Sequence, residues 1–531
     1  MADLTQIAAA ALQAWGAGDV ARAESLAREV LVHAPNDPNA RQVLGLASLR
    51  EGRAREAVAH LRAADAAAPN TAVILNSLGV ALRQAGDLVG AREAYARAGT
   101  LGLADAWRNL GSLERGDNRI DAAIAAYEKA LALQPSASAH ANLAQLHEMR
   151  HQLERAREHA EAALRIDAKN EIGRLALGQV LLRERDWEGA VALLSPMTRE
   201  ASATPVNRAL AIGLVGEALD RMGKTGEAFA AFTASNAILR ERHAAALKAV
   251  DSPFHPATVQ RLTRFVEREH IGAWRLSSAA EAPVFLVGFP RSGTTLLDQI
   301  LSSHSGVICL EEKELFAPVA ADLLSDEALA AWRAMPEAEL SQRRRAYWDG
   351  ADLALAAPRG ERIVIDKLPL NLVLLPAIAR IFPGAKIILA LRDPRDAVLS
   401  AYQQRFGMNP AMAQMLELES AARYYDAAMT LLMRCREKLP LAFHEVRYEQ
   451  VVADLEGSAR GLAAFLGAPF EPAMLEFSAT ARRRDITTPS ARQVIQPLYT
   501  RSVGRWRAYA AELAPVLPVL TPWAVKLGYP P

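Results

Sequence analysis

The chain has 531 residues, of which 51% are hydrophobic and 23% are charged. This composition excludes a disordered chain, and the length indicates two or three domains. The net charge of +1 excludes a global basic field for nucleic acid, so an anionic ligand needs a local basic site. Two cysteines, Cys309 and Cys435, exclude a disulfide framework or a four-cysteine zinc site and fit a reducing compartment.

The N-terminal stretch lacks the basic segment of a secretory signal. The unbroken apolar runs, such as 284–289 and 387–391, are far shorter than the roughly 18 residues that span a bilayer. The sequence therefore predicts a cytoplasmic protein without a membrane span, and we expect no nucleic-acid partner.

The first 240 residues repeat with a period near 34 residues. Each unit has two small residues that lie twelve positions apart. In most units a larger residue follows four positions after the later one, whereas the first and fifth units have alanine there. The later small residues are Ala23, Ala57, Ala91, Ala123, Ala156, Ala190 and Ala228, and the larger residues are Leu61, Tyr95, Tyr127, Leu194 and Phe232.

This period and pattern resemble the tetratricopeptide repeat, in which small residues let two helices approach closely and the larger residue fills the space beside them. We count six units and a looser seventh at about 206–238. The alternative, a non-repetitive alanine-rich bundle, does not explain the shared register. Residues 1–240 are therefore predicted to form a helical array whose concave groove holds a peptide or a partner protein, and a homodimer is also compatible with the sequence.

A connector is predicted at 241–282, with a short helix from Ala257 to about Glu267. Beyond it, helical patterns alternate with apolar runs. This alternation predicts βαβ units around a parallel sheet in residues 283–531. The fold class is therefore α + α/β. The apolar runs are 283–288, 362–366, 386–391 and 441–446.

The first of these runs leads through a glycine turn into the helical pattern 296–304. A strand, a glycine turn and a helix are the layout of a phosphate-binding loop, whose backbone N–H groups point at an anion. A nucleotide kinase or NTPase would need lysine where Thr294 stands, which argues against that alternative. A glycine turn without a ligand is the other alternative. The loop's candidate ligands are Pro290, Arg291, Ser292, Gly293, Thr294 and Thr295.

The segment PRSGTTLL (290–297) resembles the 5′-phosphosulfate loop of sulfotransferases that use 3′-phosphoadenosine 5′-phosphosulfate (PAPS). The segment IILALRDPRDAVLS (387–400) resembles the family's 3′-phosphate element, which assigns that phosphate to Arg392 and Ser400. Arginine supplies a forked and permanently charged donor set. An ion pair between Arg392 and Asp396 is the structural alternative. The resemblance covers about 283–510 and implies a three-layer domain with a central parallel sheet, with PAPS as co-substrate and no metal.

Two further segments are similar to the same family. Arg447-Tyr448-Glu449 is typical of these enzymes, and we include Tyr448 among the donor contacts. The stretch 490–506 resembles tyrosylprotein sulfotransferases, in which a serine and a basic residue fifteen positions later contact the donor. These residues are Ser490 and Arg505 here, and the family usually has lysine at the second position.

Sulfuryl transfer needs a base for the acceptor proton, a cation at the leaving oxygen and an anion cradle. The cradle is assigned to the loop with Arg291. The resemblance implies Glu312 as the base, with a solvated acidic turn as the alternative and His304 as a rival that does not match the family. Lys367 is assigned to the leaving oxygen, and a surface pair with Asp366 is its alternative.

The acceptor is less defined than the donor. A tyrosyl peptide, a glycan or a small hydroxyl compound all stay open, and the repeats are expected to position the acceptor or a partner. The remaining alternative is a repeat scaffold with an inactive transferase half. The intact set of Arg291, Glu312, Lys367, Arg392 and Ser400 argues against such decay.

Overall fold

The computed structural model describes residues 4–248, 252–268, 281–355, 358–483 and 501–531. The chain divides into two compact units, Met1–Ala203 and Thr204–Pro531. Across the described ranges, no helix has both the length and the apolar character that a membrane crossing requires.

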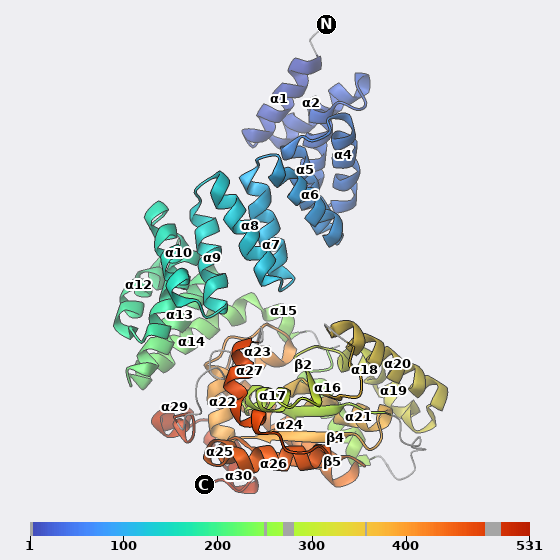
Figure 1. Cartoon of the computed structure of the whole chain (residues 1–531), viewed down its shortest axis with the longest axis vertical. Helices are drawn as coiled ribbons and strands as arrows, with labels where there is room; N and C mark the ends of the chain where they lie inside the picture. Colours follow the sequence, from blue (N-terminus) through green and yellow to red (C-terminus); the bar gives the residue numbers. More distant parts are fainter. Residues whose placement is uncertain (1–3, 249–251, 269–280, 356–357, 484–500) are drawn as a thin grey trace. The chain divides into compact units, whose positions relative to one another are not determined.

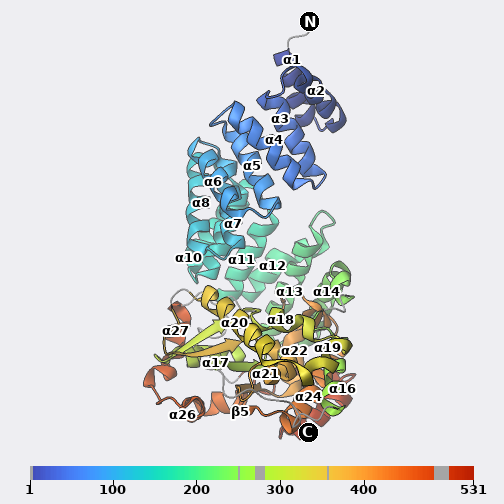
Figure 2. The ribbon, with the colours of Figure 1, turned by 90° about the vertical axis from the view of Figure 1, so that its right-hand side faces the viewer.

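The described part of the first unit consists of helical pairs that follow one another along the chain (Figure 2). Each pair corresponds to one repeat of the sequence pattern, which confirms the predicted helical array. The pairs are α1 (Leu4–Gly16) with α2 (Val20–His33), α3 (Pro38–Arg50) with α4 (Ala54–Ala67), α5 (Ala72–Gln84) with α6 (Leu88–Thr100), α7 (Ala104–Gly116) with α8 (Ile120–Leu133), α9 (Ala137–Met149) with α10 (Leu153–Ile166), and α11 (Glu171–Glu184) with α12 (Trp187–Arg199).

The small residues of the repeat allow close helix packing within each pair. A Cβ atom on Gly79 would lie 2.6 Å from the ring of Tyr95, so only glycine leaves room for that ring. The fifth pair has no large residue at the equivalent position. There Ala144 and Ala160 pack against Ala176 of the next pair, so a neighbouring repeat fills the space.

The second unit begins with a seventh helical pair, α13 (Pro205–Arg221) and α14 (Thr225–Arg242). The sequence pattern groups this pair with the repeats, whereas its contacts place it in the second unit. The helices α15 (Ala244–Leu247) and α16 (Pro256–Arg268) follow, and α16 is the short helix expected from Ala257.

The second unit contains a five-stranded sheet in which every strand pairs in parallel with its neighbour, in the order β2-β3-β1-β4-β5. Four strands match the predicted apolar runs. Sequence reasoning missed β2, because the segment that leads to Glu312 was interpreted only as the site of the base or as an acidic turn. The strands are β1 (Val284–Gly288), β2 (Val307–Glu311), β3 (Ile363–Lys367), β4 (Lys386–Leu391) and β5 (Ala442–Arg447).

Helices cover both faces of this sheet (Figure 1). Phe285 and Val287 of β1 point into one core with α20, α21 and α24, whereas Leu286 points into the other with α17 and α26. The fold is therefore the predicted three-layer α/β domain. Its α-helices are α17 (Thr294–Ser302), α18 (Phe316–Ala320), α19 (Asp326–Ala331), α20 (Glu337–Ala354), α21 (Leu375–Ile381), α22 (Pro394–Tyr402), α23 (Pro410–Gln414), α24 (Leu418–Lys438), α25 (Tyr448–Ala453), α26 (Leu455–Leu466), α27 (Phe477–Arg483), α29 (Ala510–Leu513) and α30 (Leu517–Lys526).

The carboxyl ends of parallel strands meet at one edge of the sheet. In this sheet β3 and β4 lie on either side of β1, so the chain order reverses beside β1. Open α/β sheets bind ligands at this type of switch point, outside the carboxyl ends of the strands. We therefore expect a ligand site among the residues that follow β1, β2, β3 and β4.

Candidate active site

The loop after β1 is shaped by two glycines. A Cβ atom on Gly288 would lie 2.6 Å from the carbonyl oxygen of Ala390 in the neighbouring strand β4. Gly293 adopts a left-handed backbone with φ of 98° and caps the start of α17. The first turn of α17 then contains Thr294 and Thr295, both buried. The first N–H groups of a helix lack partners within the helix and favour an anion, so this turn has the geometry of an anion cradle.

Backbone strain occurs at two predicted site residues. Arg291 has φ of 71° and Glu312 has φ of 45°. Within the described part of Thr204–Pro531, they are the two non-glycine residues with a left-handed backbone. Such conformations cost of order 1–3 kcal/mol and cluster at functional sites, which supports a functional interpretation of both positions.

Among the predicted donor residues, Arg291 contacts two that lie in a distant segment, Ser400 and Arg392. Arg291 Nε donates a hydrogen bond to Ser400 Oγ over 3.1 Å. Arg392 Nη1 donates to the carbonyl oxygen of Arg291 over 3.1 Å, and Nη2 donates to that of Ser502. The loop after β1 and the segment after β4 therefore form one site.

The side chain of Arg392 has one nitrogen without a hydrogen-bond partner among the described residues. Arg392 is 7% exposed, and its Nε atom is buried without a hydrogen bond to any described residue. A buried donor without a hydrogen bond costs about 1–3 kcal/mol, and such donors are rare in native proteins. An anionic ligand beside Arg392 would satisfy it.

Tyr448, after β5, contacts both of the predicted anion-binding segments. The guanidinium of Arg392 lies 5.0 Å from the centre of the Tyr448 ring. A Cβ atom on Gly293 would lie 3.0 Å from the same ring, so glycine lets the loop approach. Glu449 also accepts a hydrogen bond from the backbone N–H of Asp393 over 3.1 Å. Tyr448 therefore lies between the loop and the arginine.

The third donor segment is described only in part. Ser490 lies outside the described residues. Arg505 forms an ion pair with Asp220 of α13. Asp396 accepts hydrogen bonds of 2.7 Å from the backbone N–H groups of Gly504 and Trp506. Burial raises the pKa of Asp396, although Arg392 and the two N–H groups oppose the shift. Asp396 thus holds the 504–506 segment against the start of α22.

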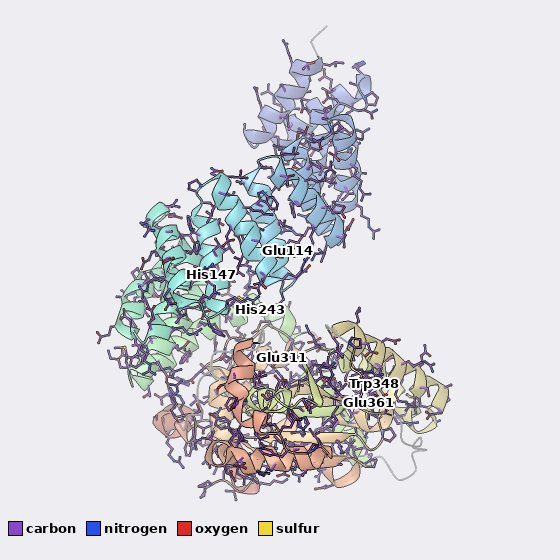
Figure 3. All side chains as sticks on the ribbon, in the orientation of Figure 1. Glu114, His147, His243, Glu311, Trp348 and Glu361 are labelled. Carbon is purple, nitrogen blue, oxygen red and sulfur yellow. The ribbon has the colours of Figure 1, made fainter. Side chains whose placement is uncertain are left out.

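The predicted base and cation form a pair at the ends of β2 and β3. Lys367 is fully buried, and its Nζ lies 3.1 Å from Glu312 Oε1 and 3.7 Å from Glu311 Oε1. The backbone N–H of Glu312 also donates to the carbonyl oxygen of Lys367 over 2.8 Å. Figure 3 labels Glu311, which ends β2. The adjacent carboxylates thus converge on one ammonium group.

The alternative of a surface pair between Asp366 and Lys367 is wrong, because both residues are fully buried and have different partners. Asp366 accepts hydrogen bonds from the hydroxyl of Tyr347 over 2.9 Å and from Nδ2 of Asn371 over 3.1 Å. Sequence reasoning missed this buried cluster behind Lys367. Its only signal was an acidic residue at the end of an apolar strand.

Burial raises the pKa of Asp366 to about 7, although the hydrogen bond from Tyr347 opposes the rise. The folded chain then binds this proton more tightly than the unfolded chain, so the contribution of Asp366 to stability falls as the pH rises from about 4 to 7. A rise from 3.8 to about 7 corresponds to about 4 kcal/mol at 1.36 kcal/mol per pH unit. We expect Asp366→Asn to remove this decline, as measured by the melting temperature across that pH range.

The exposed Asp349 of α20 offers a control for this measurement. Asp349→Asn should leave the pH dependence of melting as it is in the wild type. If Asp366→Asn melted with the wild-type pH dependence, the carboxyl of Asp366 would not titrate in this range.

His304, the rival base, has both ring nitrogens engaged by backbone groups. Nδ1 accepts a hydrogen bond from the N–H of Gly306 over 2.9 Å. Nε2 lies 2.8 Å from the carbonyl oxygen of Pro469 and donates to it. These contacts hold the end of α17, which favours a structural role for His304.

Comparison with known proteins finds a family match in each half of the chain. Residues 283–472 match the model of the Sulfotransferase family, and residues 104–136 match the tetratricopeptide repeat. An uncharacterized protein of Aquifex aeolicus is 27% identical over 355 residues, which are 64% of this chain and 45% of that protein. This chain thus spans less than half of that relative.

Protein-tyrosine sulfotransferase 1 of Danio rerio is 26% identical over 267 residues, which are 47% of this chain and 72% of that enzyme. Protein-tyrosine sulfotransferase 2 of Gallus gallus is 25% identical over 263 residues, 47% of this chain and 69% of that enzyme. Among solved structures, the sulfotransferase domain of the Synechococcus PCC 7002 olefin synthase aligns with a TM-score of 0.32 at 20% identity, over 44% of this chain and 90% of that one.

Proposed function

We propose that this chain, with its sulfotransferase-family domain at residues 283–472, transfers the sulfuryl group of PAPS to an acceptor hydroxyl. One observation carries the proposal. Arg291, in the loop after β1, contacts both Ser400 and Arg392, and the neighbouring strand β3 ends at Lys367, which pairs with Glu312. A donor with two phosphate groups needs such a pair of linked anion sites next to a base.

The two ends of the donor would be bound by different elements. The start of α17 and Arg291 would take the 5′-phosphosulfate, because helix N-termini favour anions. Arg392 and Ser400 would take the 3′-phosphate, since a guanidinium binds phosphate through forked, charge-assisted hydrogen bonds. The buried Nε of Arg392, which has no partner among the described residues, supports this assignment.

The transfer step is an in-line displacement at sulfur. Glu312 accepts the proton of the acceptor hydroxyl while the acceptor oxygen forms a bond to sulfur. The bond between sulfur and the 5′-phosphate oxygen breaks, and Lys367 stabilises the negative charge that develops on that oxygen. The 3.1 Å contact between Lys367 and Glu312 supports these roles, because it places the cation and the base at one point.

Among acceptors, we favour a tyrosine hydroxyl in a peptide, because two of the similar proteins are protein-tyrosine sulfotransferases. The tetratricopeptide repeats would then hold the acceptor or a partner protein, since stacked repeats form an extended concave surface. Transfer of labelled sulfate to peptides, glycans and small alcohols would identify the acceptor class.

The donor site is tested by calorimetry with adenosine 3′,5′-bisphosphate, the donor product. We expect the wild-type chain to bind it and Arg392→Gln to weaken binding by about 1.5–3 kcal/mol, on the order of 10- to 150-fold, because a charged hydrogen-bond donor is lost. Arg380→Gln provides a matched control. Arg380 is a buried arginine whose guanidinium donates to the carbonyl oxygens of Trp332 and Met335, and it lies at the end of α21, which leads into the amino end of β4.

The control variant Arg380→Gln should have a lower melting temperature and an unchanged affinity for adenosine 3′,5′-bisphosphate. Equal affinities of the wild type and Arg392→Gln would contradict the donor assignment. Binding of ATP with Mg²⁺ but not of adenosine 3′,5′-bisphosphate would instead support a nucleotide kinase or NTPase.

A further inference from the structure

The seventh helical pair, α13–α14, combines a repeat pattern with contacts of the transferase unit. It keeps the small-to-large packing of the repeats, because a Cβ atom on Gly216 would lie 3.0 Å from the ring of Phe232. Yet Ala228 and Phe232 belong to the same hydrophobic core as strands β1 and β4. The pair is therefore built into the second unit, Thr204–Pro531.

The helix α14 holds the end of α22. Asn236 Nδ2 donates a buried hydrogen bond of 2.9 Å to the carbonyl oxygen of Tyr402, the last residue of α22. The hydroxyl groups of Thr233 and Tyr402 lie 2.7 Å apart. The last carbonyl groups of a helix have no partner within it, so Asn236 satisfies one of them. Ser400 lies two residues before Tyr402, so this contact fixes the helix end that presents Ser400.

The helix α13 holds the segment that orients Arg392. The carboxylate of Asp220 accepts hydrogen bonds from Arg505 and from the hydroxyl of Tyr509. The carbonyl oxygen of Ser502, in the same segment, accepts from Arg392 Nη2. Asp220 thus anchors residues 502–509 on one side, and Asp396 of α22 anchors them on the other.

We infer that α13–α14 is a structural part of the donor site and that Asp220 and Asn236 are positioning residues for it. This inference rests on the proposed function, because it assumes that Arg392 and Ser400 bind the donor. Asp220 acts through the 502–509 segment on Arg392, whereas Asn236 acts through the end of α22 on Ser400. Neither residue contacts the arginine or the serine in these hydrogen bonds, so their effect is to restrict motion of the groups that do the binding.

The test uses the full chain and calorimetry with adenosine 3′,5′-bisphosphate. We expect Asp220→Ala and Asn236→Ala each to weaken binding about three- to thirtyfold, the range for residues that act through others. Asp220→Asn keeps an acceptor oxygen in place and should recover most of the affinity. The KM for PAPS should rise in both alanine variants, while kcat at saturating PAPS changes less than threefold, roughly, because the base and cation are untouched.

Arg240→Ala is the matched control. Arg240 also lies on α14. Its ion pair with Glu417 is 3.1 Å long and largely exposed, and it does not involve α22 or residues 502–509. We expect wild-type affinity for this variant. Melting temperatures of all variants show whether each one is folded at the temperature of the titration, and the two alanine variants test the inference independently.

Three outcomes would overturn the inference. Wild-type affinity in both alanine variants would show that α13–α14 does not position the donor site. Tighter binding by Asp220→Ala would show that Asp220 holds Arg505 away from the donor. If the wild-type chain does not bind adenosine 3′,5′-bisphosphate, the proposed function fails together with the inference. If the wild type binds it and both alanine variants bind it equally well, only the inference fails.

Discussion

Replacing Lys367 with methionine should lower kcat by roughly 10²–10³-fold, the effect of removing one preorganised donor to a developing oxyanion. Methionine fills a similar volume but donates no hydrogen bond and has no charge. The affinity for adenosine 3′,5′-bisphosphate should change much less, because the proposed phosphate ligands are Arg392 and the start of α17. Steady-state kinetics with labelled PAPS, together with calorimetry, measure both quantities.

Lys386→Met separates this effect from the general loss of a lysine in the sheet. Lys386 begins β4 at the opposite edge and donates hydrogen bonds to the carbonyl oxygens of Phe465 and Leu466. We expect this variant to lose stability and keep its kcat. Full turnover by Lys367→Met would refute the assigned mechanism without changing the fold.

Replacing Glu312 with glutamine should lower kcat by roughly 10²–10⁴-fold, the usual contribution of a general base. Glutamine has nearly the same shape and keeps an oxygen that can accept from Lys367 Nζ. The affinity for adenosine 3′,5′-bisphosphate should stay at the wild-type value.

Glu311→Gln is the matched control, since Glu311 is the adjacent carboxylate and its Oε1 lies 3.7 Å from the same Nζ. We expect this variant to keep most of its turnover. If Glu311→Gln lost activity and Glu312→Gln kept it, the base would be Glu311. If neither lost activity, no carboxylate of this pair would be the base.

The sequence predicted the repeats and the glycine loop after β1 because both depend on contacts that are short-range along the chain. In a repeat, Gly79 and Tyr95 belong to consecutive helices, so their pairing follows from a fixed spacing. The loop after β1 depends on Gly288 and Gly293, whose backbone requirements are local. The strand β2 was missed because its apolar run, 307–310, is too short to show a period that distinguishes a strand from a loop.

The sequence alone determined the class of both halves and the glycine loop after β1, and it supplied the residues that are proposed to transfer the sulfuryl group. Only the tertiary structure decided which of these residues meet. Lys367 reaches Glu312 because β3 lies next to β2, and Asp220 reaches Arg505 because α13 packs within the second unit. Strand order and helix docking depend on the burial of apolar faces across the whole unit, and no local pattern in the chain records which distant elements those faces will cover.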